Sequence, residues 1–104
     1  MNLSSRTLPL AEIMRRLRGV MPDLRVRYGV TALSAFGSQV RGTAGARSDL
    51  DLLVEFDRPP GFFQFVALEE ELSELLRIKV DLVMKSALRP HIGQHVVANA
   101  LPVS

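Results

Sequence analysis

Cysteine and tryptophan are both absent from this chain of 104 residues. Without cysteine, the chain can form neither a disulfide nor a thiolate metal site. It also lacks any apolar run close to the roughly 18–20 residues that a membrane span needs. Its first ten residues lack the long apolar core of a secretory signal. We therefore expect a cytoplasmic protein.

The length of the chain limits what it can build. We expect one compact domain over residues 1–104. The apolar fraction of 47% is typical of a globular protein and argues against disorder. A domain of this size has room for one core and one shallow site, but not for a separate substrate-binding domain.

The small net charge conceals an uneven distribution. Residues 1–47 carry eight arginines and two acids, a balance of +6. Residues 48–104 carry five lysines or arginines and nine acids, a balance of −4, so that the whole chain has a formal net charge of +2. Such a gradient is typical of a protein with an anionic ligand or a charged partner, and equally of a basic helix face that is simply solvated.

Hydrophobic periodicity predicts alternating helices and strands. Apolar residues recur at helical spacing over residues 10–21, with Pro9 suited to the first turn and Pro22 a stop signal. The last residues, 101–104, read as a short edge strand or a frayed end. The other expected elements are strands at 31–36, 49–56 and 79–84, and helices at 62–76 and 88–100. This order predicts an α/β (α+β) fold with a small mixed sheet of three to four strands flanked by helices.

Two aspartates stand at the head of a strand that is otherwise apolar. Burying a carboxylate without a partner is costly, so Asp49 and Asp51 need an explanation. Residues i and i+2 of a strand share a face, with Cα atoms about 6.5–7 Å apart. A divalent cation relieves the repulsion of such a pair, and magnesium usually takes one or two protein carboxylates. Paired metals are common in phosphoryl and nucleotidyl transfer.

A third carboxylate, Asp81, lies in the apolar segment KVDLVM. If this strand pairs beside the second strand, Asp81 joins Asp49 and Asp51 on one face. There it could ligate a metal or accept the proton of an attacking hydroxyl. The alternatives are an exposed aspartate at a strand end and a partner for an arginine.

The segment GSQVRG, residues 37–42, follows the first predicted strand. Gly37 allows a tight turn with close backbone approach. The Ser38 hydroxyl and the backbone amides of a following helix start could grip a phosphate. Arg41 could aim at the same anion or pair with a carboxylate.

The combination of GSQVRG with SDLDLLV, residues 48–54, resembles the minimal nucleotidyltransferases of the DNA polymerase β superfamily. The resemblance extends from about residue 30 to residue 98. It implies that Asp49 and Asp51 hold magnesium (Mg²⁺), with Asp81 as the third acidic position. It also implies that Gly37 and Ser38 contact nucleotide phosphates, and we expect Arg41 and Ser48 beside them.

Family members of this size often act as antitoxins beside a HEPN-domain ribonuclease, to which they transfer AMP from ATP. The resemblance therefore implies a magnesium-dependent enzyme that transfers AMP to a hydroxyl of a HEPN-type toxin. We expect no membrane and no direct nucleic-acid partner, and the sequence leaves open whether the protein forms a homo- or hetero-oligomer. The alternative is a non-catalytic antitoxin that neutralises its partner by direct binding. Transfer to a small molecule is disfavoured, since there is no room for a second lobe.

Aromatic residues are few. We expect Phe62, Phe63 and Phe65, at the start of the second long helix, to enter the core, although an exposed phenylalanine there could stack on a base or pack on a partner. Tyr28, the single tyrosine, is expected to be packed or partly exposed rather than to accept AMP. No aromatics interleave with the arginines at positions 15, 16 and 18, so a nucleic-acid module of the stacking kind is not supported.

Overall fold

The structure is a computed structural model that describes residues 8–37, 40, 49–88 and 90–103, with backbone alone at 90–93 and 95. The helices are α1 (Leu10–Tyr28), α3 (Phe62–Leu76) and α4 (Pro90–Asn99), with a short 3-10 helix, η2 (Lys85–Ala87). The strands are β1 (Val30–Phe36), β2 (Leu50–Phe56), β3 (Val80–Met84) and β4 (Leu101–Pro102). These elements lie within a residue or two of the predicted ones, apart from the end of α1 and the added η2.

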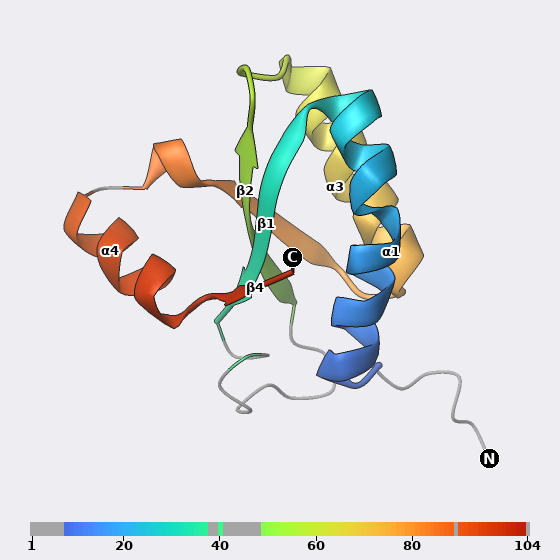
Figure 1. Cartoon of the computed structure of the whole chain (residues 1–104), viewed down its shortest axis with the longest axis horizontal. Coiled ribbons are helices and arrows are strands. Elements are labelled where there is room, and N and C mark those ends of the chain that lie inside the picture. The colour runs from blue at the N-terminus through green and yellow to red at the C-terminus, as the bar shows by residue number, and fades with distance from the viewer. Residues whose placement is uncertain (1–7, 38–39, 41–48, 89, 104) are drawn as a thin grey trace.

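The four strands form one mixed sheet in the order β3-β2-β1-β4. β1 pairs antiparallel with β2 and β4, whereas β2 and β3 are parallel. Helices α1 and α3 cover one face, and α4 lies on the other side of the sheet (Figure 1). This arrangement confirms the predicted α/β fold with a small mixed sheet of three to four strands.

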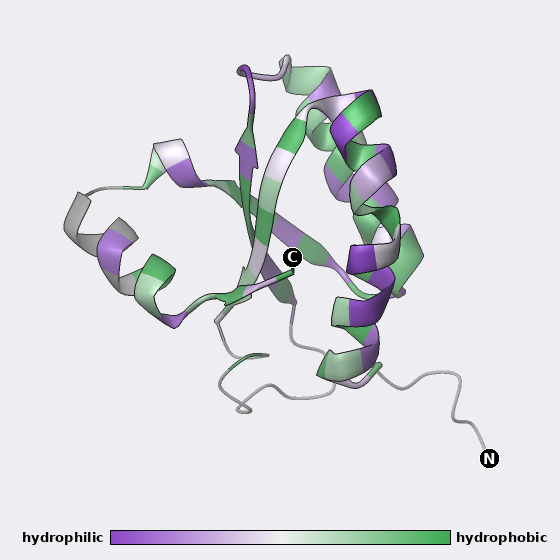
Figure 2. Cartoon of the chain, viewed as in Figure 1, coloured by the Kyte–Doolittle hydropathy of each residue, from purple (hydrophilic) through white to green (hydrophobic). Residues whose placement is uncertain are grey.

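The core lies between the sheet and the pair α1 and α3. Hydrophobic and hydrophilic residues alternate along the strands, as Figure 2 shows. In β2 the buried residues Leu50, Leu52 and Val54 are fully enclosed. Each such side chain contributes about 1.5–3 kcal/mol of stability. The alternate positions, which include Asp51, therefore point to the opposite face of the sheet.

Helix α1 does not end at Pro22, so the predicted stop was wrong. Pro22 is exposed and lies inside the helix, which continues to Tyr28. A proline within a helix costs about 3 kcal/mol, but Met21 and Leu24 continue the buried stripe on either side of it. The helix ends instead at Gly29, which has a left-handed φ of 74° and donates its N–H to the carbonyl of Arg25.

Phe62 and Phe63 do not enter the core, so the first prediction for them was wrong. They are 75% and 85% exposed, and their rings pack on each other with centroids 5.5 Å apart. Phe65 is partly buried and packs against Phe56, the last residue of β2. Phe62 and Phe63 are the first two residues of α3, and their rings contact each other outside the hydrophobic core. Among the described residues, no helix is long and apolar enough to cross a membrane.

Candidate active site

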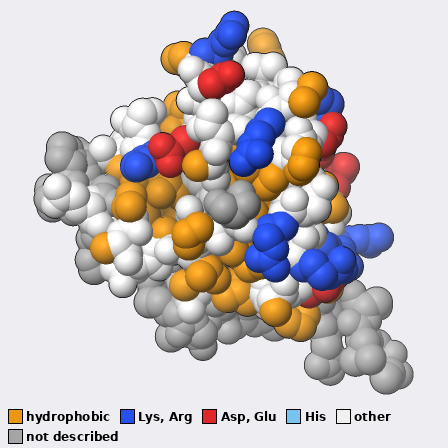
Figure 3. Space-filling view, in the orientation of Figure 1, with side chains coloured by type: hydrophobic (Ala, Val, Ile, Leu, Met, Phe, Trp, Pro, Cys, Tyr) orange, Lys and Arg blue, Asp and Glu red, His pale blue; other side chains and the backbone are white. Residues whose placement is uncertain are grey.

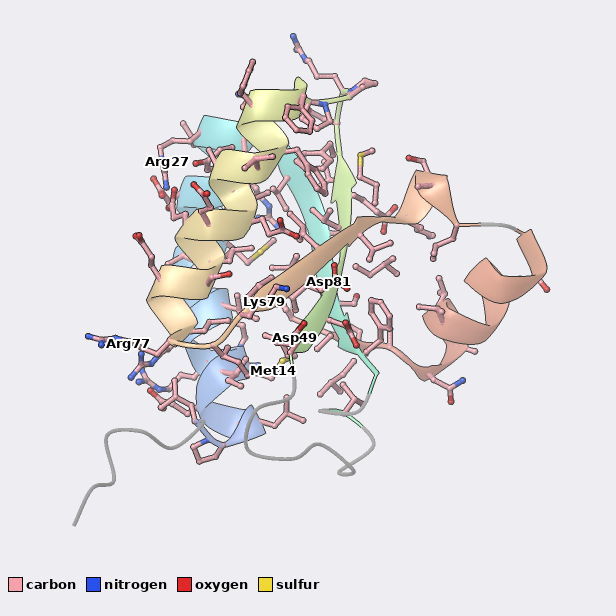
Figure 4. The ribbon with its side chains drawn as sticks, turned by 180° about the vertical axis from the view of Figure 1, so that it is seen from behind. Met14, Arg27, Asp49, Arg77, Lys79 and Asp81 are labelled. Carbon is pink, nitrogen blue, oxygen red and sulfur yellow. The ribbon has the colours of Figure 1, made fainter. Side chains whose placement is uncertain are left out.

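The pairing of β2 with β3 brings the predicted acids together. In this parallel pair Leu50 lies opposite Val80 and Asp51 lies opposite Asp81. Neighbouring strands are about 4.8 Å apart, and residues paired in this way point to the same face. Asp49 immediately precedes β2 and shares that face with Asp51. Figure 4 shows Asp49 and Asp81 at the same end of these adjacent strands. The expected pairing of the two strands, with Asp81 beside Asp51, is confirmed, whereas the shared catalytic role of the three acids stays a prediction.

Gly37 lies directly against the carboxylate of Asp51. Phe36, the last residue of β1, pairs with Asp51, and Gly37 follows it with a left-handed φ of 81°. A Cβ atom built on Gly37 would lie 2.2 Å from the Asp51 Oδ2 atom. Real Cβ atoms essentially never approach an atom this closely. The glycine therefore leaves the space that the carboxylate occupies, as well as supplying the turn.

Lys79 places a positive charge beside the acids, and the sequence analysis missed it. Its Nζ atom lies 3.9 Å from the Asp49 Oδ2 atom, and the two side chains are 78% and 44% exposed. Figure 4 shows Lys79 close to both Asp49 and Asp81. Lys79 stands two residues before Asp81, so the strand period alone could have placed it on the acidic face.

Two side chains of α3 hold β3 in position around Asp81. The Ser73 hydroxyl accepts a hydrogen bond from the N–H of Val80 at 2.9 Å. A carboxylate oxygen of Glu69 accepts one from the N–H of Leu82 at 2.8 Å. β3 is an edge strand, and these bonds satisfy N–H groups on its outer side. They fix the backbone on both sides of Asp81, and with it the direction of the carboxylate.

The donor set fits a hard divalent cation. Asp49, Asp51 and Asp81 offer only oxygen ligands, and magnesium needs one or two carboxylates because it keeps waters and substrate oxygens. Asp81 is exposed and the other two are partly exposed, so solvent and substrate can reach them. Within the described part of the chain, no three His, Cys, Asp or Glu side chains converge closely enough to enclose a metal. The three carboxylates thus share one face of the sheet without forming a closed ligand cluster, and their role as metal ligands stays a prediction.

The predicted phosphate-binding residues Ser38, Arg41 and Ser48 lie outside the described residues. Their contacts with phosphate therefore stay predictions. A cavity of about 500 Å³ lies elsewhere, at the other end of the strands, lined by residues 54–60 and 84–86. Its first lining residue, Val54, is three residues from Asp51, about 10 Å along the strand.

A charged network joins α1 to α3 away from these acids. Arg27 pairs with Asp23 and Glu71, and the Tyr28 hydroxyl donates to Glu71 at 2.9 Å. The hydrogen bond from Arg27 lowers the pKa of Glu71. Burial, followed by the bond to Glu71, raises the pKa of Tyr28. Figure 4 shows Arg27 well separated from Asp49 and Asp81, so this network supports the fold rather than the acidic site.

Comparison with known proteins gives one consistent result. Residues 14–101 match the model of the nucleotidyltransferase domain family. The protein adenylyltransferase MntA of Thermococcus cleftensis is 44% identical over 96 residues, which cover 92% of this chain and 97% of that protein.

Two solved structures share the fold. One is a minimal nucleotidyltransferase with a TM-score of 0.74 and 35% identity, matched over 88% of this chain and 93% of that one. The other is a complex of a tri-AMPylated HEPN toxin with an MNT antitoxin from Shewanella oneidensis (TM-score 0.67, 18% identity, covering 90% of this chain and 71% of that one). The chain therefore belongs to the nucleotidyltransferase domain family and, within it, to the minimal nucleotidyltransferases of the DNA polymerase β superfamily.

Proposed function

We propose that this nucleotidyltransferase transfers AMP from ATP to a hydroxyl group of a HEPN-type toxin, and that it acts as the antitoxin of that partner. The observation that carries the proposal is the register of β2 and β3, which sets Asp51 beside Asp81 with Asp49 on the same open face. The proposal places the whole chain, residues 1–104, in one catalytic domain in the cytoplasm.

In this proposal Asp49 and Asp51 hold magnesium, and Asp81 either completes the ligand set or acts as the base. Bound magnesium would offset the negative charge that builds up on the phosphate oxygens during transfer. The oxygen of the partner hydroxyl attacks the α-phosphorus, the bond to pyrophosphate breaks, and the hydroxyl proton passes to the base. Positioning and charge stabilisation then supply most of the rate, as in other phosphoryl transfers.

The remaining contacts to ATP come from the segment after β1. Gly37 supplies the turn at the end of β1 and lies against the Asp51 carboxylate, and the Ser38 hydroxyl with the following amides would hold the β- and γ-phosphates. Arg41 and Ser48 would complete this phosphate site. The hydrogen bonds from the Arg41 guanidinium to phosphate would be charge-assisted, and they would also orient the segment between the two motifs.

Two similarities support the choice of acceptor. The relative from Thermococcus cleftensis is named a protein adenylyltransferase. The complex from Shewanella oneidensis, which shares the fold, contains an AMPylated HEPN toxin. A partner protein that carries the hydroxyl would complete the site.

The second candidate function is neutralisation by direct binding, without catalysis. It is favoured by apolar surface that nothing in the described chain covers. Phe62 and Phe63 are exposed, and so are Val97 of α4 and Leu101 of β4. Figure 3 shows hydrophobic side chains gathered where α4 and β4 meet the sheet, with basic side chains over α1. A partner bound to such a surface could be blocked without being modified.

The two functions are separated by the position of the label in ATP. The chain and its purified HEPN partner are incubated with magnesium and ATP that carries the label on either the α- or the γ-phosphate. Adenylyl transfer moves only the α-label onto the partner. Transfer of the γ-label would show phosphorylation instead. If neither label moves while the two proteins form a stable complex, the proposed transfer is wrong and direct binding is favoured.

A further inference from the structure

We propose that Lys79 is the counter-ion of the acidic site in the absence of metal, and that it becomes a ligand of the ATP phosphates once a divalent cation occupies Asp49. The inference deepens the proposed function and rests on it for the identity of the nucleotide. It concerns a residue that lies outside both sequence motifs.

The position of Lys79 is fixed by the sheet. Its carbonyl accepts a hydrogen bond of 2.9 Å from the N–H of Leu50, which follows Asp49 in the chain. The register of β2 and β3 therefore places Lys79 opposite Asp49, just as Asp81 lies opposite Asp51. Any cation or phosphate bound between these carboxylates lies within reach of the lysine side chain.

The ion pair itself is weak and easily exchanged. The Lys79 Nζ and Asp49 Oδ2 atoms are 3.9 Å apart, and the lysine side chain is largely exposed to solvent while the aspartate side chain is partly exposed. Exposed pairs of this kind are screened by water and cost side-chain entropy to hold. A dication attracts Asp49 more strongly than one ammonium group does, and it also repels Lys79. The lysine stem is flexible, so its charge can turn from the carboxylate to an incoming phosphate.

This exchange gives Lys79 two effects of opposite sign. Before nucleotide binds, the ammonium competes with the cation for Asp49 and repels it, so it weakens metal binding. After the metal is in place, the same charge attracts the triphosphate, so it strengthens nucleotide binding. An ordinary surface lysine would produce neither effect.

The chain offers a matched control in Lys85. Its Nζ atom lies 3.7 Å from Glu55 Oε1, with the side chains 46% and 44% exposed. This pair also joins a lysine next to β3 with an acid of β2, but at the opposite end of the two strands. Lys85→Gln therefore removes the same charge and a similar ion pair away from the acids.

The test measures binding rather than transfer. Manganese(II) alone is titrated into the wild-type chain, Lys79→Gln and Lys85→Gln, and the bound ion is followed by electron paramagnetic resonance. A non-hydrolysable ATP analogue is then titrated at saturating manganese(II) and followed by calorimetry. We expect Lys79→Gln to bind manganese(II) about two- to fivefold more tightly and the analogue about fivefold more weakly. Lys85→Gln should match the wild type in both.

The proposal is overturned if Lys79→Gln leaves both dissociation constants unchanged or shifts them in the same direction. It is also overturned if Lys85→Gln reproduces the shifts, or if the wild-type chain binds no manganese(II). Thermal melts of the three proteins, which should agree, check that folding is equal. The opposite shifts in a chain that transfers no AMP would support the role of Lys79 while refuting the proposed function.

Discussion

Replacing Gly37 with alanine should disable the acidic site through the position of Asp51 rather than through loss of the fold. A Cβ at this position would lie 2.2 Å from Asp51 Oδ2, and contacts under 3.0 Å force something to shift. The carboxylate of Asp51 or the backbone at residue 37 must therefore shift by about 0.8 Å, the difference between these two distances. Displacements near 1 Å in a catalytic constellation can cost about a hundredfold in rate.

The same substitution also has a backbone cost. Gly37 has a φ of 81°, a conformation that costs a residue with a Cβ about 1–2 kcal/mol. In a chain of about 100 residues each kcal/mol lowers the melting temperature by about 4–8 °C. A fall in activity could therefore reflect a fall in the folded fraction, and the experiment needs a control that carries the same strain.

Gly29 supplies that control. Its φ is 74°, and a Cβ there would lie 2.5 Å from Asp57 Oδ1. The backbone strain and the clash with a carboxylate are thus both reproduced. Asp57, however, lies six residues after Asp51, about 20 Å along the strand. Gly29→Ala should destabilise the chain about as much as Gly37→Ala, while leaving the acids in place.

The assay compares AMP transfer with stability for both variants. Thermal melts should show similar losses, and transfer should be measured well below both melting temperatures. We expect Gly37→Ala to lose about ten- to a hundredfold in rate, whereas Gly29→Ala stays within about twofold of the wild type. Equal losses in the two variants, or an active Gly37→Ala, would refute the argument that Gly37 makes room for a catalytic carboxylate.

Two further predictions concern the packing of α3. Because Arg27 lowers the pKa of Glu71 below its ordinary value of 4.5, the pair contributes stability that is present above pH 4.5 and is lost as the pH falls through the lowered pKa. Thermal melts across this range should show a shallower acid decline for Glu71→Gln than for the wild type, and parallel declines would contradict the assignment. Ser73→Ala removes the acceptor of the Val80 N–H, which should cost about 1–3 kcal/mol in urea unfolding. Ser86 is exposed, so Ser86→Ala should change the free energy of unfolding by no more than about 0.5 kcal/mol. An equally small loss for Ser73→Ala would show that the hydrogen bond from the Val80 N–H to Ser73 is dispensable.

Most of the fold could be predicted because periodicity and packing agree. The strand with Asp51 and the strand with Asp81 are each apolar apart from acidic residues. Pairing the two strands in parallel puts both carboxylates on one face of the sheet. Periodicity failed where tertiary contacts decide the outcome. Leu24 is buried beyond Pro22, and its packing keeps the chain helical past the proline. Phe62 and Phe63 begin α3 but stay exposed, which their hydrophobicity alone could not indicate.

The site was predictable in part. The acids could be identified because a carboxylate in an otherwise apolar strand is unusual, although the structure leaves Asp49 and Asp51 partly exposed and Asp81 exposed rather than buried. The role of Ser38, Arg41 and Ser48 came from family resemblance, and these residues lie outside the described part of the chain. Lys79 was missed because an exposed lysine at the start of a strand is common, although its position two residues before Asp81 places it on the acidic face. The register of β2 and β3 adds that it lies opposite Asp49, with which it forms an ion pair.

The most direct test of the central claim is the intact mass of the HEPN partner after incubation with ATP, magnesium and each of three forms of this chain. The wild type and Asp57→Asn should each add one or more AMP units to the partner. Asp51→Asn, which removes one charge from the paired acids and keeps the shape of the side chain, should add none. AMP addition by Asp51→Asn at the wild-type rate would contradict the claim that the paired carboxylates of β2 and β3 form the catalytic site.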